Sequence, residues 1–441
     1  MTTPMQSWSF VVFAAMAVLL YWLAIPRRWR PHYLLTVSLG YFLACSLDQM
    51  GLPFVFLLFY LYGMFVIGIL IDTAKTPQGR RRWTVLGVVA AAGILVLFKT
   101  IATLTKVLVL LLGPGLGEWA AAGLTKFGVP IGISYFSFRV IHYLVEVYRG
   151  KERRATALEF FLYVTFFPTM VAGPIHRFFT LRREKPEDSF GVQVRGEGGL
   201  PPFKFDDISY GVWRILQGVV KKFVIADFFY RLCTPMLQPA LLLKTEWWQM
   251  WMAAHAYFVY LYIDFSGYSD IAIGISRLFG IRVMENFNWG LFAVNVQDFW
   301  RRWHISLTQW LMNYIYFPLG GGRKGEFRTD VNAMITIIAV AVWHRVSVSM
   351  FIWGFLQGLA VVFVRHYLKL KKRLFPNHRP TLWGKALGVV CVWHWQAILW
   401  PLFHHPTRIA ILYWVKMSPV IPLLKWLGVL GGADHGFGGL P

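Results

Sequence analysis

The sequence predicts an all-α, polytopic membrane protein. Of its 441 residues, 57% are hydrophobic and only 15% are charged, whereas soluble domains carry about 25% charged residues. At roughly 20 apolar residues per crossing, the apolar content is enough for on the order of ten spans. The same figures exclude a water-soluble globule, a disordered chain, collagen and a coiled coil. We expect a helical bundle of about 10–13 spans.

The first element is an uncharged N-terminal stretch, residues 1–26, which is followed at once by Arg27, Arg28 and Arg30. It has neither the basic start nor the small-residue cleavage site of a secretory signal, so we interpret residues 8–25 as a retained span. The positive-inside rule then places the N-terminus outside and the arginine cluster in the cytoplasm. The membrane we expect is the cell inner membrane.

Thirteen further apolar stretches follow: 33–47, 52–71, 84–98, 101–113, 130–147, 157–172, 208–230, 247–263, 267–281, 330–343, 347–364, 384–401 and 409–428. Several are shorter than the ~17 residues that a crossing needs, which predicts re-entrant or broken helices lining a cavity. The longest polar insert, 175–207, is predicted to be a loop. Because no internal repeat is visible, we treat residues 1–441 as a single membrane domain.

The net charge is +23, from 44 Lys+Arg and 21 Asp+Glu. In a membrane protein this surplus belongs mainly to cytoplasmic loops facing anionic lipid, so nucleic acid is not an expected partner. It also favours an anionic acyl donor such as a coenzyme or an acidic carrier protein. The three cysteines are far apart and form no CxxC pair, so neither a disulfide framework nor a metal site is expected.

Ionisable groups within apolar sequence mark functional sites by default. The first such segment carries Asp264, Ser266 and Asp270 around Gly267, between two apolar stretches. The two carboxylates are six positions apart and do not share a helical face, so a break at Gly267 would reorient them. The alternative is a polar turn or N-cap that starts a helix at 268.

The second segment runs from Asn286 to Ser306 and contains Asn295, Asp298, Arg301, Arg302 and His304, interleaved with aromatic residues. The arginines could pair with Asp298 or bind a phosphate-bearing donor. An interfacial aromatic belt with snorkelling arginines is the alternative.

A third segment is a glycine-rich turn that ends in Arg323 and Lys324. Such a turn can cradle phosphate, but it lacks the GxxxxGK[ST] pattern of a P-loop. We count both cations among the candidate substrate-binding residues.

The fourth segment gives the sharpest candidate. His344 ends a nearly pure apolar stretch, directly after Trp343, and a second apolar stretch follows. A neutral imidazole can take a proton from a hydroxyl and return it near neutral pH. A structural histidine is the alternative, as it is for His142 and His176. Ser347 is close enough to His344 on a helix to be considered a nucleophile, but no orienting carboxylate is placed beside it.

These motifs resemble those of the membrane-bound O-acyltransferase (MBOAT) family, and most of all its bacterial alginate O-acetyltransferase branch. The resemblance rests on DFWRRWHISLT from Asp298, on YFPLGGGRKG from Tyr316, and on the Trp-His and Trp-Gly pairs at 343–344 and 353–354. It is extended by PIGISYFSF from Pro130, FFPTMVAGPIHR from Phe166 and DFSGYSD from Asp264, so it covers about 130–355.

The resemblance implies acyl transfer from an activated donor to a hydroxyl, within a helical bundle around a central tunnel. The family's catalytic histidine maps to His344 and its other histidine to His304. The family usually has a small residue after the catalytic histidine, where this chain has Arg345, and a small residue before Trp343, where it has Val342. We expect these two departures to alter how the donor approaches the tunnel or which acyl group is transferred.

We therefore expect His344 to act as general base on an acceptor hydroxyl that attacks an acyl thioester. His304 or a backbone dipole would position the donor or stabilise the oxyanion. The expected donor is acetyl-CoA or an acyl carrier protein, with no bound cofactor, and the expected partner is an extracytoplasmic acetyltransferase that modifies a polysaccharide. Two alternatives stay open: D-alanyl transfer to teichoic acid from a carrier protein, and a transporter or exporter.

Overall fold

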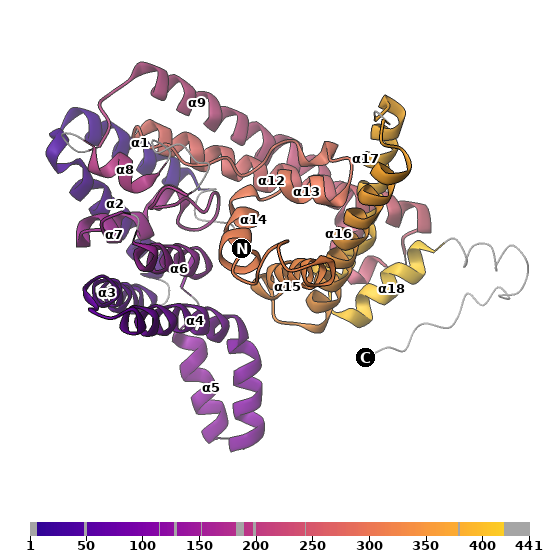
Figure 1. Ribbon diagram of the computed structural model, residues 1–441, viewed down its shortest axis with the longest axis horizontal. Coiled ribbons are helices and arrows are strands. Elements are labelled where there is room, and N and C mark those ends of the chain that lie inside the picture. The colour runs from indigo at the N-terminus through magenta and orange to yellow at the C-terminus, as the bar shows by residue number, and fades with distance from the viewer. Residues whose placement is uncertain are drawn as a thin grey trace, which may run out of the picture. The chain divides into compact units, whose positions relative to one another are not determined.

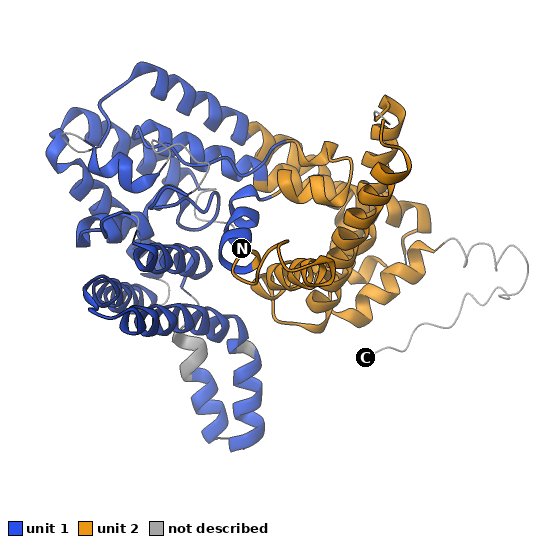
Figure 2. Ribbon diagram, in the orientation of Figure 1, with its two compact units in different colours: residues 1–219, 266–288, 304–315 blue, residues 220–265, 289–303, 316–441 orange. Residues whose placement is uncertain are grey.

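The computed structural model describes residues 7–47, 51–113, 115–127, 130–150, 152–181, 189–196, 200–242, 244–377 and 380–418. Within these ranges all regular structure is helical, which confirms the all-α prediction (Figure 1). The chain forms two compact units (Figure 2). Unit 1 comprises residues 1–219, 266–288 and 304–315, and unit 2 comprises 220–265, 289–303 and 316–441.

Unit 1 is built from the N-terminal helices and two later segments. Its elements are α1 (Trp8–Leu23), η2 (Arg27–Trp29), α2 (Arg30–Ser46), α3 (Leu52–Thr73), α4 (Pro77–Leu112), α5 (Leu116–Phe127), α6 (Ile133–Arg149), α7 (Ala157–Thr165), η4 (Phe167–Thr169), α8 (Phe190–Arg195), α9 (Phe205–Val219), residues 266–278 of α12 (Trp247–Leu278), and α14 (Ile305–Leu311).

Unit 2 contains the remaining helices. They are the π-helix η6 (Val220–Ile225), α10 (Ala226–Leu232), α11 (Thr234–Leu237), η7 (Pro239–Leu241), residues 247–265 of α12, η8 (Gly290–Phe292), α13 (Val296–Arg302), α15 (Glu326–His344), α16 (Val348–Leu374), α17 (Leu382–His404) and α18 (Thr407–Met417). A second π-helix, η9 (Met312–Tyr316), runs from unit 1 into unit 2. Residues 419–428 of the last predicted apolar stretch lie outside the described residues.

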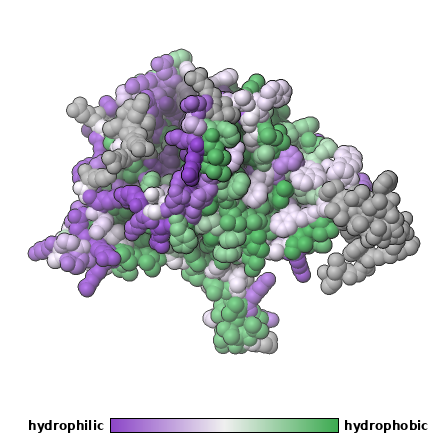
Figure 3. All heavy atoms as spheres, turned by 45° about the vertical axis from the view of Figure 1, so that its right-hand side comes forward, coloured by the Kyte–Doolittle hydropathy of each residue, from purple (hydrophilic) through white to green (hydrophobic). Residues whose placement is uncertain are grey.

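In the part of the chain that the structure describes, four helices are long and apolar enough to cross a membrane: Leu52–Thr73, Pro77–Ile101, Val348–Leu374 and Leu382–His404. Their apolar surface is extensive, and the hairpin of α4 and α5 is largely hydrophobic in Figure 3. Leu110, Leu111 and Trp119 of that hairpin are each more than 70% exposed. Such a surface is costly in water and favourable in lipid. The chain is therefore a multi-pass membrane protein.

Two of the expected boundaries are wrong. The stretches 84–98 and 101–113 belong to one helix, α4, and the stretches 247–263 and 267–281 share the continuous helix α12. The helix α12 runs through Gly267 without the break or N-cap that we expected there. The predicted loop 175–207 also contains α8 and the start of α9.

The glycine positions show how closely α12 packs on α9. A Cβ built on Gly218 of α9 would lie 2.5 Å from the Gly267 carbonyl oxygen, and one on Gly274 would lie 2.6 Å from the Gly211 carbonyl oxygen. Each helix carries its two glycines seven positions apart. Small residues at such spacing let the backbones of membrane helices touch. Gly211, Gly218 and Gly274 therefore permit a close crossing of α9 and α12, and the Gly267 carbonyl lies within this crossing.

Candidate active site

The histidine of the DFWRRWHIS segment is held at the centre of a buried polar cluster in unit 1. His304 lies between α13 and α14, is 1% exposed, and has a φ of +43°, in the left-handed region that few non-glycine residues adopt. Its Nδ1 is 3.1 Å from Oδ1 of Asn286. The Ser306 hydroxyl donates to the same oxygen at 2.8 Å. The Asn286 amide nitrogen donates to the Ser269 hydroxyl at 3.1 Å.

This cluster also fixes the segment that follows the FPTMVAGPIHR motif. The Ile175 backbone N–H donates to the Ser306 hydroxyl oxygen at 3.0 Å. Farther along, the backbone N–H groups of Phe178 and Phe179 donate to Nε2 of His142 at 3.1 and 3.3 Å. The buried imidazole of His142 is thus a hydrogen-bond partner inside the fold, which is the structural alternative for this residue.

A second network continues from His142. Its Nδ1 lies 2.7 Å from the Tyr314 hydroxyl, which donates to the Glu146 carboxylate at 2.8 Å. Arg149 forms an ion pair with the same carboxylate at 2.6 Å. Buried polar groups that are connected in this way rigidify the helices that carry them.

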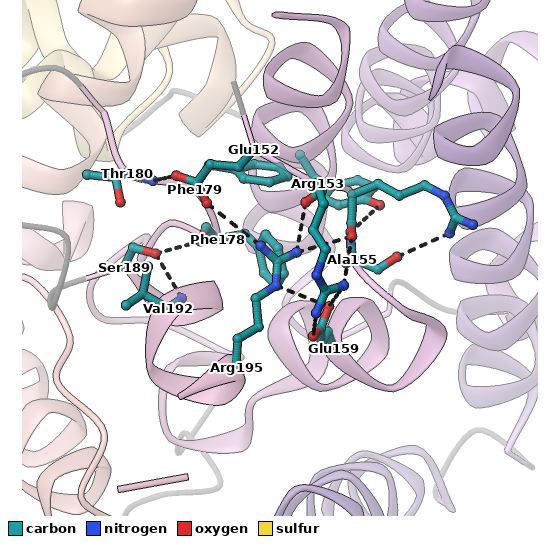
Figure 4. Close-up of polar contacts among 12 residues, drawn as sticks. Glu152, Arg153, Ala155, Glu159, Phe178, Phe179, Thr180, Ser189, Val192 and Arg195 are labelled. Carbon is teal, nitrogen blue, oxygen red and sulfur yellow. Dashed lines mark hydrogen bonds and ion pairs between the residues drawn. The ribbon is translucent and has the colours of Figure 1, made fainter. Parts of the chain in front are cut away.

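An ionic cluster holds the C-terminal end of the segment 175–180 (Figure 4). Arg195 of α8 lies 3.4 Å from the Glu159 carboxylate and 3.7 Å from that of Glu152. Arg153 pairs with Glu159 at 2.9 Å, and the Glu152 carboxylate accepts the Thr180 backbone N–H at 3.3 Å. Residues 175–180 are therefore tied to the body of unit 1 at both ends.

The other predicted catalytic residue belongs to unit 2. His344 is the last residue of α15 and is half-buried, with its ring centroid 4.9 Å from that of Phe403 and 4.3 Å from that of Trp343. The close packing of α15 on α16 sets this position, because a Cβ on Gly354 would lie 2.6 Å from the Ala341 Cβ. His344 thus sits at a helix end against an aromatic wall.

Arg345 anchors the turn that follows. Its guanidinium donates to the Phe403 carbonyl at 3.2 Å, in the last turn of α17, and to the hydroxyls of Ser347 and Ser349 at 3.3 Å each. The Ser347 hydroxyl also caps α16 by accepting the Met350 N–H. The cation at the C-terminal end of α17 is favourable because the last carbonyls of a helix carry partial negative charge.

The polar residues ahead of His304 have local partners within unit 2. Asn295 is the N-cap of α13 and accepts the Asp298 backbone N–H at 2.9 Å. Asp298 in turn accepts the Val294 N–H and pairs with Arg302 at 2.9 Å. These contacts complete the helix start. Arg301 is exposed, and a donor-binding role for these four residues stays a prediction.

The residues around Gly267 divide between the two units. Asp264 pairs with Lys222 of η6 in unit 2 at 2.5 Å. Ser266 is buried in unit 1, and Asp270 pairs there with Arg214 of α9. Each of the two carboxylates is thus paired with a cation of its own unit.

The glycine-rich turn is an exposed part of unit 2. Gly320, at a φ of +111°, accommodates the Lys324 side chain, since a Cβ there would lie 2.9 Å from Lys324 Cδ. Lys324 and Arg323 are both exposed. Beside them, the Lys369 ammonium holds the pKa of the Glu326 carboxyl below its usual value by hydrogen bond and charge. The turn therefore combines two open cations with an ionic cluster at the start of α15.

Among the described residues, no group of three or more His, Cys, Asp and Glu side chains is arranged to hold a metal ion.

Comparison with known families decides the identity of this helical protein. The sequence model of the MBOAT, or membrane-bound O-acyltransferase, family matches residues 133–404. The chain belongs to the MBOAT family. The matched region contains every site residue that we predicted, from Asp264 to His344.

The curated relatives of this MBOAT protein include proteins named as O-acetylases, O-acetyltransferases and D-alanyltransferases. The chain is 34% identical over 354 residues to the probable alginate O-acetylase AlgI of Azotobacter vinelandii, covering 77% of this chain and 64% of that protein. It is 30% identical over 331 residues to the peptidoglycan O-acetyltransferase of Helicobacter pylori, covering 69% and 59%. It is 26% identical over 278 residues to the teichoic acid D-alanyltransferase of Bacillus subtilis, covering 60% and 66%. The chain spans 58–64% of the length of the two AlgI proteins of A. vinelandii and Pseudomonas aeruginosa.

Sequence reasoning missed two residues of this MBOAT protein's polar clusters, and it missed the contact that a third residue makes. Lys222 interrupts the apolar stretch 208–230, and a cation in such a place is itself a signal that it has a partner. Arg214 gives the same signal in the same stretch. Asn286 was visible as a polar residue, but its contact with His304 joins residues 18 positions apart and depends on the fold.

Proposed function

We propose that this MBOAT protein is an O-acyltransferase that moves an acyl group, most simply acetyl, from a thioester donor to hydroxyls of an extracytoplasmic polysaccharide. The observation that carries the proposal is the family match, which includes both His304 and His344. It is supported by relatives whose names specify O-acetylation of alginate or of peptidoglycan. The family match also argues against the transporter alternative.

In the proposed reaction, Nε2 or Nδ1 of His344 accepts the proton of the acceptor hydroxyl while the oxygen attacks the thioester carbonyl. The C–S bond then breaks, and the proton passes from the imidazolium to the departing thiolate. His304 positions the donor. The exposed cations Arg301, Arg323 and Lys324 attract an anionic donor, acetyl-CoA or an acyl carrier protein, from the cytoplasmic side of the inner membrane. No bound cofactor is needed for this chemistry.

The acceptor lies across the membrane from such a donor. We propose that a tunnel through the bundle passes the acyl group outward, and that an extracytoplasmic acetyltransferase partner completes transfer to the polymer. The N-terminus would face outward, because Arg27, Arg28 and Arg30 follow the first helix.

The test compares cells that carry the wild-type protein, His344→Ala or the control His32→Ala at equal abundance. His32 is exposed and lies outside the region that matches the family. The ester groups of the surface polymer are quantified by mass spectrometry. Loss of O-acetyl esters in His344→Ala alone is expected, and wild-type acetylation in that variant would refute the catalytic assignment.

D-alanyl transfer to teichoic acid is a second candidate, because two teichoic acid D-alanyltransferases are 26–27% identical to the chain. The same mass spectra distinguish it, since D-alanyl and acetyl esters differ in mass. D-alanyl esters that depend on His344 would favour this candidate over acetylation.

A further inference from the structure

We propose that Asn286 is a positioning residue that holds His304 in the tautomer with its proton on Nδ1, so that His304 serves the reaction as a hydrogen-bond acceptor through Nε2. This inference rests on the proposed function for its link to acyl transfer. The tautomer itself follows from the hydrogen bonds within unit 1.

The first step is the orientation of the Asn286 side-chain amide. The backbone N–H of Ser306 points at one end of the amide at 3.4 Å and can only donate. The Ser306 hydroxyl lies 2.8 Å from the same atom and already accepts the Ile175 N–H. The atom that they share must therefore be the oxygen, Oδ1, and the nitrogen faces the Ser269 hydroxyl.

The second step is the protonation of His304. Oδ1 of Asn286 has only lone pairs to offer, so the Nδ1 atom 3.1 Å away must carry a hydrogen. A neutral imidazole has one N–H, and the lone pair is then on Nε2. Asn286 and His304 are 0% and 1% exposed, so water does not compete for this bond.

The backbone reinforces the arrangement. The Asn286 carbonyl accepts the Ile305 N–H at 2.8 Å. His304, the residue before Ile305, has a left-handed backbone conformation. Strained residues of this kind persist where the surroundings determine them, and they cluster at functional sites. Both the main chain and the side chain of Asn286 thus act on the two residues 304 and 305.

We considered two roles for His304, and this tautomer excludes one of them, the stabilisation of an oxyanion. Stabilising an oxyanion requires a donor, and the N–H of this imidazole is already used by Asn286. An acceptor at Nε2 can instead bind an N–H or O–H of a substrate that reaches this buried ring, such as an amide of the donor's pantetheine arm or the acceptor hydroxyl. We therefore assign His304 to substrate positioning through Nε2.

The direct test is nitrogen NMR of the full-length protein in nanodiscs with ¹⁵N-labelled histidine. The His304 signal is assigned by its loss in His304→Asn, a substitution that tolerates the left-handed backbone. The expected wild-type spectrum shows a protonated Nδ1 and an unprotonated Nε2. Asn286→Asp retains an acceptor and should keep this pattern, whereas Asn286→Leu should lose it. A wild-type His304 protonated at Nε2 would overturn the proposal.

A double-mutant cycle supplies the functional test. Asn286→Leu should reduce O-acetylation by about 10- to 100-fold, as loss of an orienting partner of histidine commonly does, and Asn286→Asp should restore most of it. If Asn286 acts through His304, adding Asn286→Leu to His304→Asn has no further effect. Independent losses in the two variants would overturn the proposal.

The exposed Asn288, two positions away, gives the matched control Asn288→Leu, which should retain wild-type acetylation. Failure of this inference can be distinguished from failure of the proposed function. Acetylation that survives His344→Ala would refute that function, while the NMR pattern of His304 would still decide the tautomer.

Discussion

Lys222 of η6 and Asp264 of α12 form an ion pair 2.5 Å long. The lysine side chain is 5% exposed and that of the aspartate 31%. Each of these charges would be costly alone in such surroundings, and each makes the other tolerable.

Removing one partner of this pair should therefore destabilise the protein more than removing both. We expect Lys222→Met to lower the free energy of unfolding by about 3 kcal/mol, because it leaves a partly buried carboxylate without its cation. The double change Lys222→Met with Asp264→Leu should recover most of that loss. Thermal unfolding in detergent measures both.

The control is Arg231→Met, which breaks an ion pair with Asp227 whose side chains are 79% and 51% exposed. Exposed pairs contribute about 0–1 kcal/mol, so this variant should unfold near the wild-type temperature. Equal losses in Lys222→Met and Arg231→Met would contradict the prediction.

Gly218→Ala should destabilise unit 1, because the new Cβ would lie 2.5 Å from the Gly267 carbonyl oxygen. Overpacking of this kind costs about 1–3 kcal/mol. Gly93→Ala in α4 is the matched control, since a Cβ there meets nothing within 4 Å. That change should leave the unfolding temperature unchanged or raise it, as alanine favours the helix. A stable Gly218→Ala protein would show that the two backbones are farther apart.

Tyr314→Phe should weaken the buried network of α6. It removes the hydroxyl that lies between Nδ1 of His142 and the Glu146 carboxylate, and leaves both without that partner. The expected loss is about 1–3 kcal/mol in the free energy of unfolding. Tyr148→Phe, at a tyrosine that is 39% exposed, is the control. Identical unfolding curves for the two variants would refute a structural role for the network.

Arg345→Lys should reduce acyl transfer without unfolding the protein. A lysine has one side-chain nitrogen and cannot replace two: Nε of Arg345 contacts the Ser347 hydroxyl, while Nη2 contacts the Ser349 hydroxyl and the Phe403 carbonyl. Since small displacements of a catalytic group are costly, we expect about 10-fold less O-acetyl ester on the polymer. The unfolding temperature of the purified protein should stay close to that of the wild type. A fully active lysine variant would show that His344 does not depend on this anchor.

The fold class was predictable because apolar composition is a property of the whole chain. The limits of single helices were not, as Gly267 illustrates. A glycine between two carboxylates signals a turn when only its own helix is considered. In the structure its carbonyl lies in a helix crossing against Gly218 of another helix, and this contact joins residues 49 positions apart.

The candidate site, too, was predictable only in part. His304 and His344 stood out because polar groups in apolar sequence need a reason, and both lie within the region that matches the family. The partners of His304 could not be predicted, since the contacts of Asn286, Ser269 and Ser306 depend on how three segments meet. Whether the two histidines act on one substrate stays a prediction.

Where α9 crosses α12, the glycines bring the two main chains into contact, and the side chains of Ile215, Ile271 and Leu278 pack against them. At the crossing of α9 with residues 266–278 of α12, sliding would drive one peptide group into another, and separation would expose the ion pair of Arg214 with Asp270. We therefore expect these two helices to move together as one rigid body. A conformational change that opens or closes a path through the protein should involve other helices.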